Sequence, residues 1–247
     1  MPHEIDRIAP TLRPDEIVVM RHRWADLLFL HWPVPISALR PLVPEALEID
    51  TFEGVAYVGL VPFTMTGVRF AWLPPVPGTS RFHETNLRTY VHHRGRDPGV
   101  WFFSLDAANA LAAWAARRFG GLAYHYARMS LDRTDEGIAH RCERLRPGPT
   151  PAGCDLAYRP EGTATASRPG TLEFFLAERY VLYALRRGRL LRGRVHHEPY
   201  PLQPARVFRL EESLLAAAGL ARPEGVAPLA HYAREVHVRV YPIRSVD

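Results

Sequence analysis

RFHETNLRTYV, residues 81–91, predicts a β-strand whose two faces differ in chemistry. Alternate side chains of a strand point to the same side. One face therefore carries a carboxylate, an amide, a guanidinium and a phenol, on Phe82, Glu84, Asn86, Arg88 and Tyr90. Such a face is either solvated, with a Glu84–Arg88 pair at the surface, or it lines a polar cavity. The aromatic residues at its two ends favour the cavity.

This strand is the first half of a predicted hairpin. Phe82–Val91 and Val100–Leu105 flank Arg94–Pro98, a segment with the Gly and Asp that turns favour. The 23 prolines and 17 glycines divide the rest of the chain into short segments, which favours a β-rich fold. A Pro/Gly-rich loop is expected at Leu73–Ser80. Further strands are expected at 17–32, Val55–Leu60, Thr64–Phe70 (separated from the previous one at Pro62), Ala123–Asp132, Ile138–Arg144, Cys154–Pro160, Leu190–His197, Ala205–Leu210 and Glu235–Tyr241.

Few helices are predicted. Ala107–Phe119 is Ala-rich, with Asp106 as its N-cap and Gly120–Gly121 as its end. Leu172–Arg187 is a second helix, closed by Gly188, and shorter ones are expected at Ile36–Leu42 and Glu211–Ala218. Strands and helices do not alternate as in βαβ units, so the expected class is α+β with a curled antiparallel sheet. The 247 residues are expected to form one domain, 1–247.

The chain contains no lysine, because all 31 of its basic residues are arginine. Without a side-chain amine it cannot form a lysine Schiff base, bind pyridoxal phosphate covalently or place a P-loop lysine on a phosphate. Arginine stays charged and serves as a planar clamp for anions. The net charge of +5 permits an anionic partner without requiring one.

The absence of three kinds of sequence motif predicts where the protein is located and whether it binds a metal. Cys142 and Cys154 match no CxxC or zinc spacing, which indicates reduced thiols in a cytoplasmic protein. The first residues contain no apolar signal segment, and the longest apolar runs, Leu27–Leu30 and Ala110–Ala116, are too short for a membrane span. The tract His196-His197-Glu198 matches no metal motif, so we expect no metal and no cofactor. A homo-oligomer is left open.

Two other motifs have a structural interpretation beside a functional one. The arginine run Arg186–Arg194 could hold nucleic acid, but no recognition motif accompanies it, so a solvated face is favoured. Glu178-Arg179-Tyr180 is placed inside the second helix, where a buried ion pair is as good an interpretation as a site. Ser104 lacks the turn that exposes a nucleophilic serine.

Six ordered stretches together resemble the YqjF-like family, a bacterial family of uncharacterised function: HWPVPISALRPLVPEALEIDTFEG, VPFTMTGVRF, FHETNLRTYV, GVWFFSLDA, FFLAERYVLYA and HHEPYPLQPA. This family is similar in fold to the acetoacetate decarboxylase superfamily. The resemblance implies a β-rich, barrel-like fold with a few peripheral helices around an internal pocket.

The resemblance also implies site residues. Glu84 matches a pocket glutamate of the superfamily, and Tyr124 and His125 stand near the place of its lysine pair. The superfamily's pocket arginine has no clear match, Arg23 being a loose candidate. Lysine-dependent acetoacetate decarboxylase activity is excluded.

Two functions follow as hypotheses. The chain binds a small metabolite, anionic or carbonyl-containing, through Phe82, Asn86, Arg88 and Tyr90. Alternatively, it is a non-covalent acid–base enzyme, such as a keto–enol isomerase or decarboxylase-like lyase, in which Glu84 transfers a proton and Tyr124 or His125 relays it.

Overall fold

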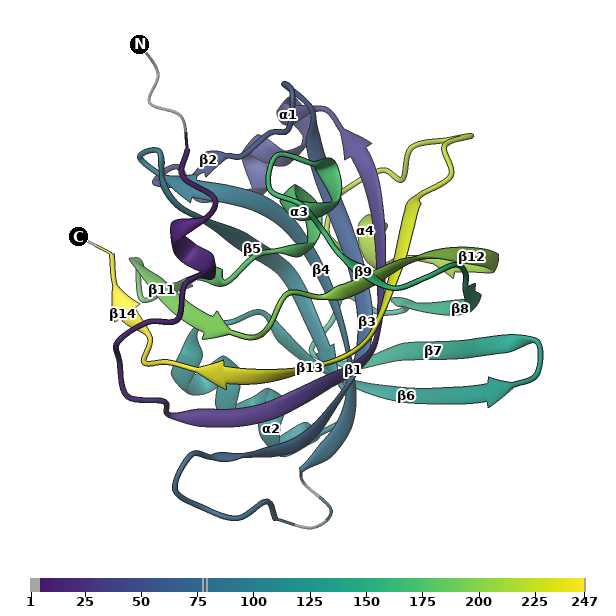
Figure 1. Ribbon diagram of the computed structural model, residues 1–247, viewed down its shortest axis with the longest axis horizontal. Coiled ribbons are helices and arrows are strands. Elements are labelled where there is room, and N and C mark those ends of the chain that lie inside the picture. Colours follow the sequence, from purple (N-terminus) through teal and green to yellow (C-terminus); the bar gives the residue numbers. More distant parts are fainter. Residues whose placement is uncertain (1–4, 77, 79, 247) are drawn as a thin grey trace.

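The computed structural model describes residues 5–76, 78 and 80–246, and most of its described elements are strands of one curled sheet (Figure 1). Residues 77 and 79 of the predicted loop Leu73–Ser80 lie outside the described part. The described strands are β1 (Met20–Val34), β2 (Glu48–Ile49), β3 (Ala56–Phe70), β4 (Arg81–His93), β5 (Arg96–Ala107), β6 (Tyr124–Thr134), β7 (Gly137–Arg146), β8 (Gly153–Pro160), β9 (Thr165–Ala166), β10 (Val181–Arg186), β11 (Arg189–His196), β12 (Pro201–Glu212), β13 (Leu229–Val240) and β14 (Arg244–Ser245).

The strands follow the order β14-β11-β10-β5-β6-β7-β8-β12-β13-β1-β3-β4-β2. Two further pairings, β4 with β5 and β11 with β13, join strands that stand far apart in this order, which requires the sheet to curl. Most pairs are antiparallel, and β5 pairs parallel to both β6 and β10. The predicted β-rich class with a curled, mainly antiparallel sheet is confirmed.

The strands β1, β3 and β4 are covered on both faces. Every residue from Asp26 to Trp32 is buried, and so is every residue from Ala56 to Met65. Leu28, Leu30 and Trp32 pack into one apolar cluster, whereas Leu27 and Phe29 pack into another on the opposite face. Covering both faces explains why these strands are apolar throughout instead of alternating.

The predicted break at Pro62 is wrong, because β3 runs through it. Pro62 pairs with Thr85 of β4 on one side. On the other side, the register of β1 shifts between Ala25 and Leu30, opposite residues 61–63. A proline has no N–H for the sheet, and this irregularity lies where that donor would be needed.

The predicted helix Ala107–Phe119 is shorter than expected. Strand β5 continues to Ala107, and α2 (Ala110–Ala115) begins after Asn109, whose side chain accepts from the backbone N–H of Ala112. A π-helical turn, η3 (Ala116–Gly120), follows. Asp106 is therefore not the N-cap, because β4 and β6 pair with it on either side.

The predicted helix Leu172–Arg187 is wrong beyond its first turns. Helix α3 covers Leu172–Ala177, and the chain then enters β10, which pairs with β11 and with β5. Arg187 and Gly188 both have positive φ, so Gly188 belongs to a hairpin turn and not to a helix end. The run Arg186–Arg194 consequently lies on this hairpin.

The other helices are short. The predicted helix Ile36–Leu42 appears as α1 (Ile36–Leu39) followed by the 3-10 turn η2 (Arg40–Leu42). The predicted helix Glu211–Ala218 is reduced to α4 (Leu214–Ala217), because β12 extends to Glu212. A further 3-10 turn, η1, covers Ala9–Thr11. Among the described helices, none has the length and apolar character to cross a membrane.

Candidate functional site

The polar face of β4 lies inside the protein. Phe82, Glu84, Asn86, Arg88 and Tyr90 are all buried, the most exposed of them at 8 %. This burial excludes the solvated alternative, and no ion pair joins Glu84 to Arg88 among the described residues. We call these five residues, together with Tyr124, the β4 site.

Glu84 and Tyr124 form one end of the β4 site. The Tyr124 hydroxyl donates to Glu84 Oε2 over 2.9 Å. Burial raises the pKa of Glu84 to about 8; the hydrogen bond from Tyr124 opposes this shift, and the charge of Asp106 adds to it. Burial also raises the pKa of Tyr124 well above its ordinary value. At neutral pH, Glu84 is therefore a protonated acid that can donate a hydrogen bond or a proton.

Arg88 and Tyr90 form the other end. The Arg88 Nη2 donates to the Leu176 carbonyl over 3.1 Å, and the Tyr90 hydroxyl donates to the same carbonyl over 2.7 Å. Tyr90 also lies 2.7 Å from His31 Nε2. Burial lowers the pKa of His31 well below its ordinary value, so its imidazole is neutral. Because the Tyr90 proton points to Leu176, His31 Nε2 carries the proton of their shared hydrogen bond.

Arg88 differs from the other buried arginines in the described chain. Arg144 is paired with Asp106, and Arg179 with Asp50, in both cases through a buried carboxylate. Arg88 has no described carboxylate within ion-pair distance, and its Nε is buried without a partner. Its guanidinium lies 5.7 Å from the ring centres of both Phe29 and Tyr90. A buried cation with only neutral partners is costly, which makes Arg88 a candidate anion-binding group.

Gly59 allows His31 to reach Tyr90. In the sheet, His31 pairs with Gly59, and Gly59 pairs with Arg88. A Cβ at position 59 would meet two atoms of the His31 ring at 2.9 Å and the Tyr90 hydroxyl at 3.4 Å. The imidazole therefore lies across β3, where any side chain would displace it.

Gly59→Ala is expected to destabilise the protein by about 1–3 kcal/mol, the usual effect of overpacking a core. Urea unfolding measures the change. Gly120→Ala is the matched control, because the nearest described atom to its Cβ would be Leu122 Cδ1 at 3.7 Å. Equal stabilities for the two variants would show that the contact between His31 and Gly59 is not tight.

The segment after β11 forms another side of the interior, next to the β4 site. His197 stacks on Tyr180, with ring centres 4.4 Å apart, and lies 4.3 Å from Tyr200. Tyr200 packs edge-on against Phe29 at 5.1 Å. Glu178 accepts hydrogen bonds from the Tyr180 hydroxyl and the Tyr200 N–H. This side meets the β4 site at Phe29, beside Arg88.

Sequence reasoning missed His31, Glu178, His197 and Tyr200 as neighbours of the site. The sequence does single out the tract around Glu178, but as an ion pair within a helix. It also singles out the tract around His197, but as a candidate group of metal ligands. The structure places Glu178 after the end of α3. In the described chain, no group of three or more His, Cys, Asp or Glu residues is placed to hold a metal ion.

Two predicted site residues lie elsewhere. His125 Nδ1 is 2.8 Å from the Pro147 carbonyl, and among the described residues no hydrogen bond joins it to Glu84 or Tyr124. Neighbouring residues of a strand point to opposite sides, and Tyr124 takes the side of Glu84. Arg23 pairs with Glu235 in a half-exposed position on β1. The proton relay predicted for His125 is therefore not supported by these contacts.

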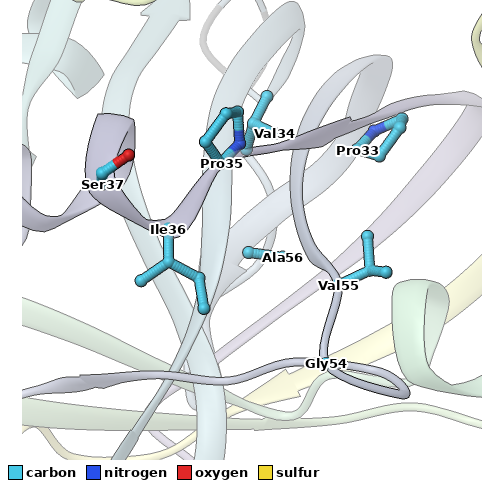
Figure 2. A pocket seen from close by; sticks show the side chains of 8 residues that line it. All are labelled: Pro33, Val34, Pro35, Ile36, Ser37, Gly54, Val55 and Ala56. Atoms are coloured by element: carbon cyan, nitrogen blue, oxygen red, sulfur yellow. The ribbon is translucent and has the colours of Figure 1, made fainter.

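Two surface hollows lie apart from the β4 site. One, of about 590 Å³, is lined by residues 33–37 and 54–56 where β1 leads into α1 (Figure 2). The other, of about 1110 Å³, lies along β6, β7 and β8. Neither is lined by a residue of the β4 site.

Comparison with known proteins places the chain in a family. A family model of uncharacterized conserved proteins, DUF2071, matches residues 21–237. The chain belongs to the DUF2071 family. It is 41 % identical over 232 residues to the uncharacterized protein YqjF of Bacillus subtilis strain 168, a match that covers 94 % of each chain.

Solved structures similar to this DUF2071 protein share its fold at low sequence identity. The enduracididine biosynthesis enzyme MppR, complexed with pyruvate, has a TM-score of 0.63 at 13 % identity, covering 96 % of this chain and 92 % of that one. The acetoacetate decarboxylase of Legionella pneumophila has a TM-score of 0.60 at 13 % identity, covering 100 % and 94 %. The predicted resemblance in family and fold is thus confirmed.

Proposed function

We propose that this DUF2071 protein binds a small organic anion at the β4 site, with the anionic group on Arg88. The supporting observation is that Arg88, unlike Arg144 and Arg179, is buried without a described carboxylate. A carboxylate ligand would provide the missing counter-charge and could accept from the unpartnered Nε. The pyruvate held by MppR, a protein of the same fold, supports a small acid as the ligand.

The order of groups along β4 defines the rest of the ligand. Residues two apart on one face of a strand are separated by roughly 7 Å, so Arg88, Asn86 and Glu84 form a row. Asn86 Oδ1 is buried without a partner and can accept from a hydroxyl or amine in the middle of the ligand. Protonated Glu84 can donate to a carbonyl oxygen at the far end. We infer an acid whose carbonyl group lies several bonds from its carboxylate, so that the ligand extends from Arg88 to Glu84. This ligand would be held in a barrel-like interior.

The second candidate is an acid–base enzyme acting on the same ligand. Its supporting observation is the buried pair of Glu84 and Tyr124, in which Glu84 has a pKa of about 8. A group with a pKa near the working pH is suited to proton transfer. The absence of lysine excludes an imine intermediate. Glu84 would instead protonate the carbonyl oxygen or an enol carbon directly.

The two unpaired cysteines support a reducing, cytoplasmic setting.

A thermal-shift screen of keto acids whose carbonyl lies at increasing distance from the carboxylate, from 2-oxo acids to long-chain oxo acids, followed by NMR analysis of the products, tests both candidates. Binding predicts stabilisation by keto acids and none by the corresponding neutral amides. The enzyme predicts conversion as well, which Glu84→Gln should abolish while leaving the thermal shift in place. Unchanged conversion in Glu84→Gln would contradict the enzyme, and the absence of stabilisation by any anion would contradict the binding proposal.

Glu84 is also expected to make stability depend on pH. Its folded pKa of about 8 lies above the ordinary value of 4.5, so the folded state holds a proton that the unfolded state has lost. The resulting contribution to the free energy of unfolding is complete below pH 4.5. It falls by up to about 1.4 kcal/mol per pH unit above that value and is lost as the pH rises through about 8. Urea unfolding at pH 6.5 to 8 should therefore show a steeper decline for wild type than for Glu84→Gln. Parallel curves would contradict the buried, protonated acid.

A further inference from the structure

The outer side of α2 and η3 carries large apolar side chains that no part of the described chain covers. Ala113 faces inward and is buried, whereas Leu111, Trp114 and Phe119 are between 58 % and 64 % exposed. The rings of Trp114 and Phe119 meet edge-on with their centres 5.8 Å apart, so they form one patch. Contiguous exposed apolar patches commonly mark sites of interaction with a protein or a membrane.

The hairpin of β10 and β11 continues this patch. A Cβ on Gly121, just after η3, would lie 2.8 Å from Arg186 Cβ, so the two segments are in direct contact. A Cβ on Gly120 would lie 3.9 Å from Ile243 Cδ1. Ile243 and Leu185 add two more exposed apolar side chains at this junction. We call these five apolar side chains, together with the arginines of residues 117–118 and 186–189, the α2 surface.

The two main segments of the α2 surface carry positive charge alone. Residues 107–131 and 179–197 contain no Asp or Glu. Five arginines in them have no carboxylate within ion-pair distance in the described part of the chain: Arg117, Arg118, Arg186, Arg187 and Arg189. Two carboxylates from neighbouring segments are already paired, Asp97 with Arg192 and Glu16 with Arg244. The α2 surface is therefore both apolar and cationic.

This composition distinguishes between three kinds of partner. Two copies related by a twofold axis present the same patch to each other, so arginines would face arginines. Single-stranded nucleic acid stacks its bases on aromatic rings, which leaves Leu111, Leu185 and Ile243 without a role. The surface of an anionic bilayer suits both components, because its phosphates attract arginine and its interface accepts Trp, Phe and Leu side chains.

We propose that the α2 surface binds the face of an anionic lipid bilayer. Leu111, Trp114 and Phe119 enter the boundary between headgroups and acyl chains, and the unpaired arginines contact the lipid phosphates. Binding of this kind lies on the membrane and requires no spanning helix. The inference is independent of the proposed function, because the β4 site lies in the interior.

Flotation of the full-length chain with unilamellar vesicles tests the proposal. Vesicles of phosphatidylcholine mixed with phosphatidylglycerol should bind wild type roughly tenfold or more tightly than vesicles of phosphatidylcholine alone. Phe119→Ser should weaken this binding roughly tenfold, because the bilayer loses a buried aromatic ring. Phe208→Ser is the matched control: Phe208 on β12 is 51 % exposed and has the Arg159 guanidinium 5.9 Å from its ring centre.

The charge contribution has its own matched pair of variants. Arg118→Gln/Arg189→Gln removes one exposed arginine from each segment of the α2 surface and should weaken binding roughly tenfold. Arg206→Gln/Arg222→Gln removes the same net charge from exposed positions elsewhere and should bind as wild type does. Equal binding by the two double variants would overturn the proposal, and so would equal binding by Phe119→Ser and Phe208→Ser.

Wild type alone also gives a decisive result. Failure to float with the anionic vesicles, or equal binding to both kinds of vesicle, would overturn the proposal. Sedimentation velocity without lipid checks for a second copy, and an oligomer that Phe119→Ser dissociates would assign the α2 surface to self-association instead. Binding of a polythymidine oligonucleotide that anionic vesicles do not displace would assign it to nucleic acid instead.

Discussion

Arg88→Met should abolish anion binding and, at the same time, raise the stability of the empty protein. The guanidinium is buried with neutral partners, namely the Leu176 carbonyl and the rings of Phe29 and Tyr90. Replacing a poorly compensated buried charge with an apolar side chain of similar volume gains about 1–4 kcal/mol in comparable cases. Losing the charged partner of a buried anion costs about 2–5 kcal/mol of binding, or roughly thirtyfold or more.

Arg179→Met is the matched control for this experiment. Arg179 is equally buried, but its guanidinium donates to Asp50 over 2.8 Å. Its removal leaves a buried carboxylate with less compensation, so this variant should lose stability where Arg88→Met gains it. Urea unfolding and calorimetric titration with a keto acid measure the two effects. A loss of stability in Arg88→Met as large as that in Arg179→Met would show that Arg88 serves the fold and not a ligand.

The chemistry of the β4 site could be predicted from local pattern, because a strand fixes which residues share a face. Glu84, Asn86 and Arg88 were found in this way. The partners of these residues could not be found. His31 reaches Tyr90 only because Gly59 lacks a side chain. Tyr200, between β11 and β12, reaches Phe29 because both of these strands pair with β13, which pairs with β1. Such neighbours depend on pairings between distant strands, which no local periodicity encodes.

The predicted helix Leu172–Arg187 is wrong for the same reason, because pairing with distant strands decides the structure of its second half. Apolar residues at Phe174, Phe175 and Leu176 suit a helix, and the segment after them could continue it. Tertiary pairing decides otherwise, because residues 181–186 pair with β11, and Leu182 and Tyr183 also pair with β5. The helix therefore ends at Ala177. That early end positions the Leu176 carbonyl, to which Arg88 and Tyr90 both donate.

The second large effect is expected at the buried pair of Asp106 and Arg144. Arg144 donates twice to the Asp106 carboxylate, from Nε over 2.7 Å and from Nη2 over 2.8 Å, and both side chains are at most 2 % exposed. The Ser104 hydroxyl, a neutral group, also donates to Asp106 Oδ2 over 3.2 Å. Arg144→Met should therefore cost about 3–5 kcal/mol, because it leaves an uncompensated buried charge.

The double variant Asp106→Leu/Arg144→Met separates two free energies of unfolding. One is the loss caused by leaving the buried Asp106 charge unpaired, and the other is the contribution of the ion pair itself. If the loss in Arg144→Met comes from leaving Asp106 unpaired, removing both charges should restore most of the stability, since well-packed apolar pairs often match buried ion pairs. A double-mutant cycle by urea unfolding measures the coupling between the two residues. Additive losses would contradict this account, and would mean that Arg144 and Asp106 stabilise the sheet through separate contacts.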